Sequence, residues 1–443
     1  MTHDHTPRPL TSHRAGPLSG RVRVPGDKSI SHRALMFGAL ASGRTRITGL
    51  LEAEDVVNTA RAVTALGAKA SKTGTVWEVL GRGVGGLSPP AGPLDFGNSG
   101  TGSRLMMGVI AGQPITVTMQ GDASLSRRPM GRVLEPLKRM GLQVIGASQD
   151  KLPLTIRGSS ELVPIVYELP VASAQLKSAI LLAGLAAAGE TTVISEETRD
   201  HTERMLAFFG AKLRTERRGS KVAITVSGDA ELVGSDVIVP GDPSSAAFLA
   251  AAALIVPGSE VAIDGILINP TRIGFYDTLR EMGADVAFLD QRTEGGEPVA
   301  DLRVRYSRLK GVRVPAGRAP SMIDEYPILA AVAAFADGET RMEGLAELKV
   351  KESDRLAATA AGLVVNGVSA QVEGDTLIVG GRGAAGVKGG GTVVTHMDHR
   401  IAMAFLTLGL GTDAPVTIDD ASFIATSFAE FRGLMESLGA RFE

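Results

Sequence analysis

The chain has 443 residues, a formal net charge of −2 at pH 7, 44% hydrophobic residues and 21% charged residues. A chain of this length exceeds one ordinary hydrophobic core, so we expect two domains, and the near-zero charge argues against a general binder of nucleic acid or of membrane surfaces. No cysteine is present, which excludes disulfides, thiolate metal ligands and a cysteine nucleophile.

The first segment, residues 1–15, contains prolines and histidines and lacks the apolar centre of a secretory signal. We therefore predict a flexible tail there. The longest apolar run, residues 246–256, is too short to cross a bilayer. Together with the absence of cysteine, these features favour a cytoplasmic protein with no membrane partner.

A glycine turn at residues 25–27 leads into an apolar run at 34–41 and places Lys28, Ser29 and Arg33 at its front. This pattern is typical of an anion-binding turn at the start of a helix, because the free N–H groups and the positive dipole end attract phosphate or carboxylate. Taken alone the indication is weak, since a Gly-Asp turn begins many helices that bind nothing.

Self-similarity along the chain is the strongest sign of its organisation. A helix of small and apolar residues, a turn glycine and a short β-like run recur six times, and the turn glycines lie 69 to 80 residues apart. The six predicted helices are 31–42, 101–111, 173–188, 244–257, 324–337 and 400–410. Units of about 70 residues are too small to be secure alone, so we expect them to pack helices inward and sheets outward.

A repeated hexamer marks the boundary between two halves of three units each. Residues 24–29 and 239–244 are nearly identical Val-Pro-Gly-Asp turns. We expect the N-terminal strand to cross back and join the second half, which would leave two connections and permit an open and a closed state. The predicted α/β domains are 25–240 and 1–24 plus 241–443, with hinges near 24–26 and 239–241.

The polar groups at the predicted helix starts differ from unit to unit. Residues 97–104 form a Gly-rich loop in which Gly100 would let a ligand approach the backbone closely. Residues 173–175 offer hydroxyl and amide donors at the start of the third unit. In the fifth unit Asp324 and Glu325 stand at a helix start, where capping and general-base catalysis are both possible roles.

Seven cations stand at predicted turns or helix starts rather than along helix exteriors. They are Lys28, Arg33, Arg128, Arg199, Lys351, Arg355 and Arg400. Lys351 and Arg355 are four residues apart and are predicted to share a helix face, with Glu352 beside them. If these cations converged they would repel one another strongly unless a polyanion lay among them. The sequence therefore predicts a substrate with several phosphate or carboxylate groups.

Taken together and in order, the motifs resemble those of the 5-enolpyruvylshikimate-3-phosphate synthase family. The matching motifs are 25–33, 97–104, 127–130, 173–175, 324–327, 351–355 and 398–403. The resemblance covers nearly the whole chain and implies the enolpyruvyl transferase fold, with two inside-out α/β domains of three βαβαββ-type units each. It also implies transfer of the enolpyruvyl group of phosphoenolpyruvate to the 5-hydroxyl of shikimate 3-phosphate, with release of phosphate, in the shikimate pathway to chorismate and the aromatic amino acids.

The resemblance implies a role for each residue at a matching position. Asp324 would accept the proton of the 5-hydroxyl. Glu352, with Lys28 or Lys351, would handle the protons at the methylene carbon of phosphoenolpyruvate. The residues that would bind shikimate 3-phosphate are Lys28, Ser29, Arg33, Ser173, Ala174, Gln175, Arg199, Asp324 and Lys351. Those that would bind phosphoenolpyruvate are Lys28, Gly100, Arg128, Gln175, Arg355 and Arg400.

Two positions depart from one branch of this family. Thr426 stands where that branch has a lysine, and Glu347 stands where it has an asparagine. Both features, with residues 199–201, resemble the other branch, often called class II. Members of that branch that are insensitive to glyphosate carry alanine at the position of Gly100. Because glyphosate occupies the phosphoenolpyruvate site and is longer, Gly100 predicts an enzyme that is sensitive to glyphosate.

Two alternatives stay open at this point. The sister enolpyruvyl transferase that acts on UDP-N-acetylglucosamine would share the fold, but its usual loop cysteine is absent and Lys28 is followed by Ser29 rather than asparagine. A non-catalytic repeat protein that binds an anion would bind without turnover, although the presence of Asp324 and Glu352 argues against it. Two carboxylates can serve both proton transfers, so we expect no metal and no other cofactor. We also expect a monomer with no nucleic-acid partner.

Overall fold

The computed structural model describes residues 6–146, 150–228 and 231–443, which fall into two compact units. Unit 1 comprises the N-terminal residues up to Pro25 together with Gly241–Arg292 and Pro298–Glu443. Unit 2 comprises Gly26–Pro240 and Thr293–Glu297. No pattern in the sequence indicates that the short segment Thr293–Glu297 belongs to unit 2.

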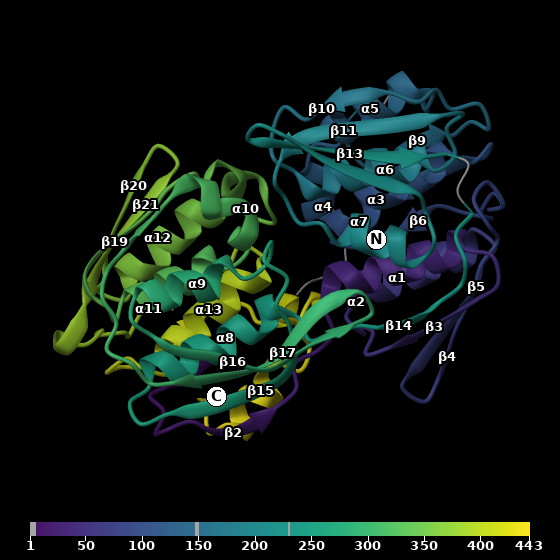
Figure 1. Cartoon of the computed structure of the whole chain (residues 1–443). Helices are drawn as coiled ribbons and strands as arrows, with labels where there is room; N and C mark the ends of the chain where they lie inside the picture. Colours follow the sequence, from purple (N-terminus) through teal and green to yellow (C-terminus); the bar gives the residue numbers. More distant parts are fainter. Residues whose placement is uncertain (1–5, 147–149, 229–230) are drawn as a thin grey trace. The chain divides into compact units, whose positions relative to one another are not determined.

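Unit 2 contains three four-stranded sheets among the described residues (Figure 1). The first has the order β14 (Asp236–Ile238), β3 (Arg44–Thr48), β5 (Val76–Leu80) and β4 (Lys69–Thr73). The second has the order β6 (Leu94–Asp95), β7 (Thr116–Gln120), β9 (Leu154–Arg157) and β8 (Gln143–Ile145). The third has the order β10 (Val166–Glu168), β11 (Glu190–Glu196), β13 (Lys221–Ser227) and β12 (Leu213–Arg218).

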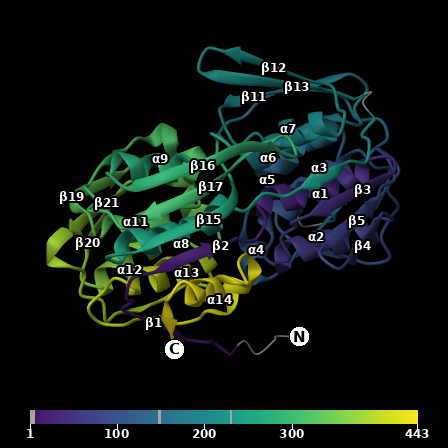
Figure 2. The same cartoon turned by 60° about the horizontal axis from the view of Figure 1, so that its bottom comes forward.

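Unit 1 also contains three four-stranded sheets within its described part. The first has the order β16 (Asp285–Glu294), β17 (Glu297–Arg305), β15 (Glu260–Leu267) and β2 (Ser19–Val22), and Figure 2 shows β2 beside β15. The second has the order β18 (Arg313–Val314), β19 (Asp337–Met342), β21 (Thr376–Arg382) and β20 (Ser369–Glu373). The third has the order β22 (Thr392–Val393), β23 (Val416–Ile418), β1 (Leu10–His13) and β24 (Arg441–Phe442).

All six sheets share one plan, in which a parallel pair of strands continues into an antiparallel one. In unit 2, for example, β6 runs parallel to β7, and β9 is antiparallel to both β7 and β8. In unit 1, β18 runs parallel to β19, and β21 is antiparallel to both β19 and β20. The repeated plan confirms the six similar α/β units that the sequence predicts.

Two strands are exchanged between the repeats at the repeated Val-Pro-Gly turns. Strand β2 precedes helix α1 in the chain, yet it pairs in parallel with β15 of unit 1. Strand β14 precedes helix α8, yet it pairs in parallel with β3 of unit 2. The chain therefore passes from one unit to the other between Pro25 and Gly26 and again between Pro240 and Gly241.

One almost wholly buried helix from each repeat fills the interior of its unit. These helices are α1 (Lys28–Leu40), α3 (Gly100–Ala111), α6 (Ala174–Gly184), α8 (Pro243–Ile255), α11 (Tyr326–Ala333) and α13 (His399–Gly409). Their small and apolar side chains allow close packing, and every residue of α8 is buried. The starts of α1, α3, α6 and α13, together with the turn before α11, carry most of the predicted site residues.

The remaining helices are shorter or only half-buried. They are α2 (Glu54–Ala65), α4 (Ala123–Arg127), α5 (Gly131–Met140), α7 (His201–Phe208), α9 (Gly274–Glu281), α10 (Ala319–Met322), α12 (Arg355–Val365) and α14 (Phe431–Ser437). Four 3₁₀ turns in the described residues are η1 (Ala316–Arg318), η2 (Ala346–Val350), η3 (Gly383–Ala385) and η4 (Ser422–Thr426). No helix in the described part of the chain is long and apolar enough to span a membrane.

The prediction of a flexible tail over residues 1–15 is wrong where the structure describes it as a strand. Residues 1–5 lie outside the described part, but β1 pairs antiparallel with both β23 and β24. Leu10 and Ser12 point inward and are buried. Four residues carry too short an alternation to predict a strand, and the hydrogen bonds that order them come from residues more than 400 positions away.

Candidate active site

The start of α1 carries three of the predicted binding residues. Asp27 caps the helix, because its side chain accepts a hydrogen bond from the N–H of Ile30 at 2.8 Å. Lys28 Nζ donates to Asp55 Oδ2 of α2 at 3.1 Å. Asp55 therefore holds the ammonium group of Lys28 in place, a role that the sequence does not indicate.

Arg33 joins three helices of unit 2 and is only 3% exposed. Its Nε donates to Thr202 Oγ1 of α7 at 2.7 Å, and its Nη2 donates to Ser178 Oγ of α6 at 2.8 Å. Its Nη1 donates to the carbonyl oxygen of Ser29 at 3.0 Å. The guanidinium group thus ties the starts of α1, α6 and α7 together, and its binding of shikimate 3-phosphate stays a prediction.

The Gly-rich loop before α3 brings Arg128 close to the start of that helix. Arg128 Nη2 donates to Asn98 Oδ1 at 2.5 Å and to Ser124 Oγ at 3.3 Å. A Cβ atom built on Gly100 would lie 3.0 Å from Arg128 Nη1 and 2.9 Å from Arg104 Nη1. Gly100 therefore leaves room for two guanidinium groups beside the backbone, as the sequence pattern predicts for a close approach.

The start of α6 carries the other polar residues predicted in unit 2. Ser173 caps the helix through a 3.4 Å hydrogen bond from the N–H of Leu176, and Ala174 and Gln175 follow in the first turn. Gln175 Oε1 accepts from Arg104 Nη1 at 2.9 Å. Gln175 is therefore held at a fixed place beside α3.

Two further residues complete the description of unit 2. Arg199 is half-buried in the segment between β11 and α7. His32 is wholly buried, with Nδ1 2.8 Å from Thr59 Oγ1 and Nε2 3.4 Å from Ser99 Oγ. Burial, together with the nearby charges of Lys28 and Arg33, lowers the pKa of His32 to about 3, so its ring is neutral at pH 7.

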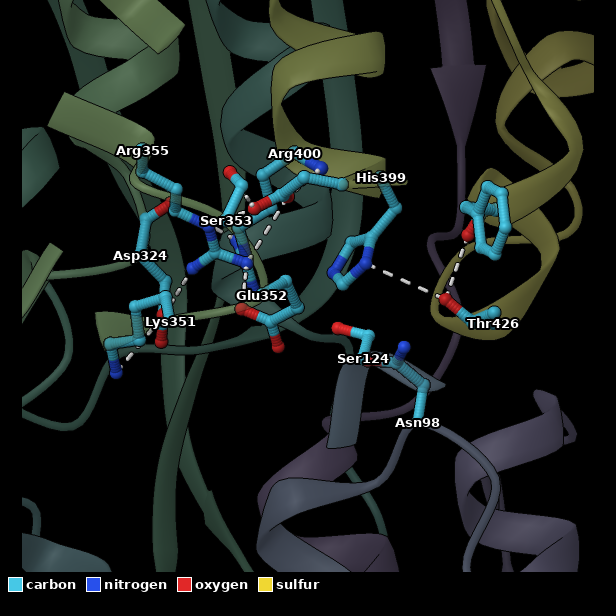
Figure 3. A network of polar contacts seen from close by, with 12 residues as sticks. Asn98, Ser124, Asp324, Lys351, Glu352, Ser353, Arg355, His399, Arg400 and Thr426 are labelled. Carbon is cyan, nitrogen blue, oxygen red and sulfur yellow. Dashed lines mark hydrogen bonds and ion pairs between the residues drawn. The ribbon is translucent and has the colours of Figure 1, made fainter. Parts of the chain in front are cut away.

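In unit 1 the predicted residues gather around the guanidinium group of Arg355, the first residue of α12 (Figure 3). Its Nη1 lies 3.2 Å from Asp324 Oδ1, and its Nη2 contacts Glu352 Oε2. On its other edge, Nε donates to Asp398 Oδ2 at 2.8 Å. Lys351 Nζ lies 3.8 Å from Asp324 Oδ1. The two predicted catalytic carboxylates, of Asp324 and Glu352, therefore both contact the guanidinium group of Arg355.

The prediction that Lys351 and Arg355 share a helix face is wrong. Lys351 follows the 3₁₀ turn η2 with backbone angles that are not helical, and α12 begins only at Arg355, after a cap by Asp354. The polar Ser353 and Asp354 favour a cap over a continuous helix. Lys351 and Arg355 meet instead through the shared partner Asp324.

Charge compensation keeps Arg355 and Asp398 ionised inside the protein. Burial alone would lower the pKa of Arg355, but the carboxylates of Asp398, Glu352 and Asp324 raise it above its ordinary value. Burial alone would raise the pKa of Asp398, but Arg355 lowers it below its ordinary value. Within unit 1 the charge of Arg355 is thus balanced by the carboxylates that surround it.

Arg400 lies on the first turn of α13, close to the segment that carries Asp324. Its backbone N–H donates to Asp398 Oδ1 at 2.9 Å, which caps the helix. Its Nη1 donates to the carbonyl oxygen of Asp324 at 3.2 Å and lies 3.7 Å from Glu325 Oε1. Glu325 occupies the position before α11 but makes no side-chain cap bond.

Thr426, which departs from one branch of the resembling family, lies beside the start of α13. Its Oγ1 is 3.5 Å from His399 Nδ1 and donates to the carbonyl oxygen of Phe423 at 2.7 Å (Figure 3). The described residues contain no group of His, Cys, Asp and Glu that could hold a metal ion. The stretch from His396 to His399, with its two histidines and Asp398, is therefore not such a group.

The chain is similar to known proteins over nearly its whole length. The family described as EPSP synthase (3-phosphoshikimate 1-carboxyvinyltransferase) matches residues 13–435. This chain belongs to that family. Proteins named 3-phosphoshikimate 1-carboxyvinyltransferase from Methylorubrum populi and from Afipia carboxidovorans are 61% and 60% identical to it, over 100% of this chain and 99% and 100% of theirs.

Solved structures agree with this membership of the EPSP synthase family. The EPSP synthase of Acinetobacter baumannii has a TM-score of 0.87 and 43% sequence identity, over 98% of this chain and 99% of that one. The enolpyruvyl transferase NikO from Streptomyces tendae has a TM-score of 0.77 at 19% identity, over 99% of each chain, and supports the fold alone. The family and the enolpyruvyl transferase fold predicted from the sequence are therefore confirmed.

Several polar residues around the predicted site were not found by sequence reasoning. They are Asp55, Ser178 and Thr202, while Asn98 and Asp398 stand in motifs that the sequence singles out, without their pairing to Arg128 and Arg355. Each acts through a partner far away in the chain, such as the 43 positions that separate Arg355 from Asp398. Asp398 carried a further local signal, because an aspartate directly before an apolar helix indicates a cap.

Proposed function

We propose that this chain transfers the enolpyruvyl group of phosphoenolpyruvate to the 5-hydroxyl of shikimate 3-phosphate and releases phosphate, in the shikimate pathway to chorismate. Membership of the EPSP synthase family and the identity of 61% to a relative with that name support the assignment. The structural observation that carries it is the meeting of Asp324 and Glu352 on Arg355, with Lys351 beside Asp324.

The first step is an addition, which needs a base at the hydroxyl and an acid at the methylene carbon. Asp324 takes the proton of the 5-hydroxyl while the hydroxyl oxygen bonds to the central carbon of phosphoenolpyruvate. Glu352, with Lys28 or Lys351, supplies the proton that the methylene carbon gains. The product is a tetrahedral intermediate that still carries the phosphate group.

The second step is an elimination that reverses the proton transfer at the former methylene carbon. That carbon, now a methyl group, returns a proton to the group that supplied it. The carbon–oxygen bond to phosphate breaks, and its electron pair leaves with the phosphate. The enolpyruvyl double bond forms again, and the proton that Asp324 took from the 5-hydroxyl passes to the departing phosphate or to solvent. The two steps therefore balance with no oxidant or reductant.

Binding of both anionic substrates is assigned to the cations and amide donors at the helix starts. Lys28, Gly100, Arg128, Gln175, Arg355 and Arg400 hold phosphoenolpyruvate. Lys28, Ser29, Arg33, Ser173, Ala174, Gln175, Arg199, Asp324 and Lys351 hold shikimate 3-phosphate. Guanidinium groups suit these roles because their paired N–H donors match carboxylate and phosphate oxygens. The cations also stabilise the charge of the tetrahedral intermediate.

The proposal extends to the branch of the family, the oligomeric state and the location of the enzyme. We propose that the chain belongs to the class II branch, and the residues Arg199, Glu347 and Thr426 support this assignment. The contact of Thr426 with His399 supports the view that a neutral hydroxyl takes the place of the lysine found in the other branch. We further propose a cytoplasmic monomer that needs no cofactor.

Release of inorganic phosphate from the purified protein tests the function directly. Phosphoenolpyruvate and shikimate 3-phosphate are supplied alone and together, with EDTA present throughout, and UDP-N-acetylglucosamine replaces shikimate 3-phosphate in a parallel series. Release only with phosphoenolpyruvate and shikimate 3-phosphate together supports the proposal. Release with the sugar nucleotide instead, or tight joint binding without release, would contradict it.

A further inference from the structure

A row of buried polar side chains in unit 1 leads from the start of α8 to the guanidinium group of Arg400. Arg272 Nη2 lies 3.2 Å from Asp242 Oδ1 and donates to Ser244 Oγ at 3.1 Å. Ser244 Oγ in turn donates to Glu325 Oε1. The same Glu325 oxygen lies 3.7 Å from Arg400 Nη1.

The side chains in this row are almost wholly buried, which restricts the conformations that they can adopt. The side chains of Glu325 and Arg272 are 3% and 2% exposed, and that of Arg400 is 8% exposed. A carboxylate in such a place is costly unless a cation and hydrogen-bond donors compensate it, and Ser244 and Arg400 provide both. Glu325 makes no side-chain cap bond at the start of α11, and its carboxylate contacts Ser244 and Arg400.

Arg400 Nη1 contacts both the backbone of Asp324 and the side chain of Glu325. The carbonyl oxygen of Asp324 accepts a hydrogen bond from Arg400 Nη1 at 3.2 Å. The carboxylate of Glu325 lies 3.7 Å from that same nitrogen. Nη1 is therefore held on the side of Asp324 and Glu325, which limits the directions in which the guanidinium group can turn.

We propose that Glu325 is a positioning residue that orients the guanidinium group of Arg400 for phosphoenolpyruvate, with Ser244 and Arg272 holding the Glu325 carboxylate in place. This inference rests on the assignment of Arg400 to phosphoenolpyruvate made above. It assigns to the second carboxylate of the Asp324-Glu325 pair a role distinct from proton transfer. Glu325 acts through Arg400 and does not touch the reacting atoms.

Steady-state kinetics of Glu325→Gln, Arg400→Lys and the double variant test the proposal. Gln keeps an oxygen that can accept from Ser244 but removes the charge that faces Arg400. We expect Glu325→Gln to raise the KM for phosphoenolpyruvate roughly tenfold, as the loss of a charge-assisted contact does. The KM for shikimate 3-phosphate should stay within about twofold, because only one substrate depends on Arg400.

The double variant separates positioning from a general loss of structure. If Glu325 acts through Arg400, the double variant is no worse than Arg400→Lys alone. A KM for phosphoenolpyruvate that is unchanged in Glu325→Gln, or effects that multiply in the double variant, would overturn the positioning role while leaving the Arg400 assignment intact. An unchanged KM in Arg400→Lys would refute the assignment itself, and the positioning role with it.

Two further variants keep the test decisive if Glu325→Gln does not fold. Ser244→Ala removes the donor to Glu325 but keeps the carboxylate, and we expect a rise of roughly two- to threefold in the KM for phosphoenolpyruvate. Tyr276→Phe is the matched control, because it removes a buried 2.7 Å hydrogen bond to the carbonyl oxygen of Pro243 within the same region. A KM that is unchanged in Ser244→Ala, or raised equally in Tyr276→Phe, would contradict the proposal.

Discussion

Arg355 and Asp398 form a two-point ion pair in the interior of unit 1. Arg355 Nε lies 2.8 Å from Asp398 Oδ2, and its Nη2 lies 3.3 Å from Oδ1. The two side chains are 1% and 0% exposed. Arg355 also contacts Asp324 and Glu352. Its pairing with Asp398 therefore fixes the guanidinium group that both proposed catalytic carboxylates contact.

Removing the charge of Asp398 should therefore destabilise unit 1 and impair activity together. We expect Asp398→Asn to lower the free energy of unfolding by about 3 kcal/mol, because it leaves a buried guanidinium group without its main partner. Urea unfolding followed by far-UV circular dichroism measures the loss. Asp413→Asn is the control, since Asp413 pairs with Arg14 on the surface and should cost less than about 1 kcal/mol. Equal losses in the two variants would contradict the importance of burial.

Neutralising a proposed proton-transfer group should stop chemistry without unfolding the protein. We expect Asp324→Asn and Glu352→Gln each to lower kcat by roughly 100- to 10,000-fold, the usual contribution of a positioned acid or base. Phosphate release under saturating substrates measures kcat, and circular dichroism checks the fold. Glu373→Gln, a change at an exposed surface pair with Arg341, should leave kcat unchanged. Near-normal kcat in both site variants would refute their catalytic roles.

Substitution of Gly100 should separate the inhibitor from the substrate. A Cβ at this position would lie about 3 Å from the guanidinium groups of Arg104 and Arg128, which must then move. We expect glyphosate to inhibit the natural protein, and Gly100→Ala to raise the inhibitory concentration about tenfold, with a smaller rise in the KM for phosphoenolpyruvate. Gly433→Ala, where a Cβ meets nothing within 4 Å, is the control. An equal loss of affinity for inhibitor and substrate would count against this explanation.

The buried ring of His32 should make the stability of unit 2 depend on pH. Burial and the charges of Lys28 and Arg33 lower its pKa to about 3 in the folded protein, whereas an unfolded histidine has a pKa of about 6.5. Between these values only the unfolded chain takes up the proton, so stability falls as pH falls from about 6.5 to about 3, by at most about 1.4 kcal/mol per pH unit from this group. Above pH 6.5 the group has no effect.

Urea unfolding at several pH values measures this dependence, and the only tryptophan, Trp77, reports on unit 2 because it lies in β5. We expect His32→Gln to give a shallower slope between pH 6 and pH 4, by up to about one proton. The exposed His396 supplies the control variant His396→Gln, which should keep the slope of the natural protein. A slope that is the same in all three proteins would show that His32 is not the titrating group.

How far the sequence predicts the fold can be judged from particular segments. The glycine spacing and the apolar helices indicate six repeats, because an interior helix must be apolar around its whole circumference and this is visible in a local window. Strand β1 was missed, because its partners β23 and β24 lie at the other end of the chain. Lys351 and Arg355 were assigned to one helix because spacing alone does not reveal a cap at Asp354.

The repeat count, the family and the polar residues at the helix starts are all predictable without coordinates. These follow from residue types in order along the chain, which local propensity and motif matching read directly. The pairing of charges, by contrast, depends on the three-dimensional fold: Lys28 pairs with Asp55, and Arg355 pairs with Asp324, Glu352 and Asp398. The partners in these pairs come from different helices and turns, and a Coulomb interaction depends on distance in space rather than on separation along the chain.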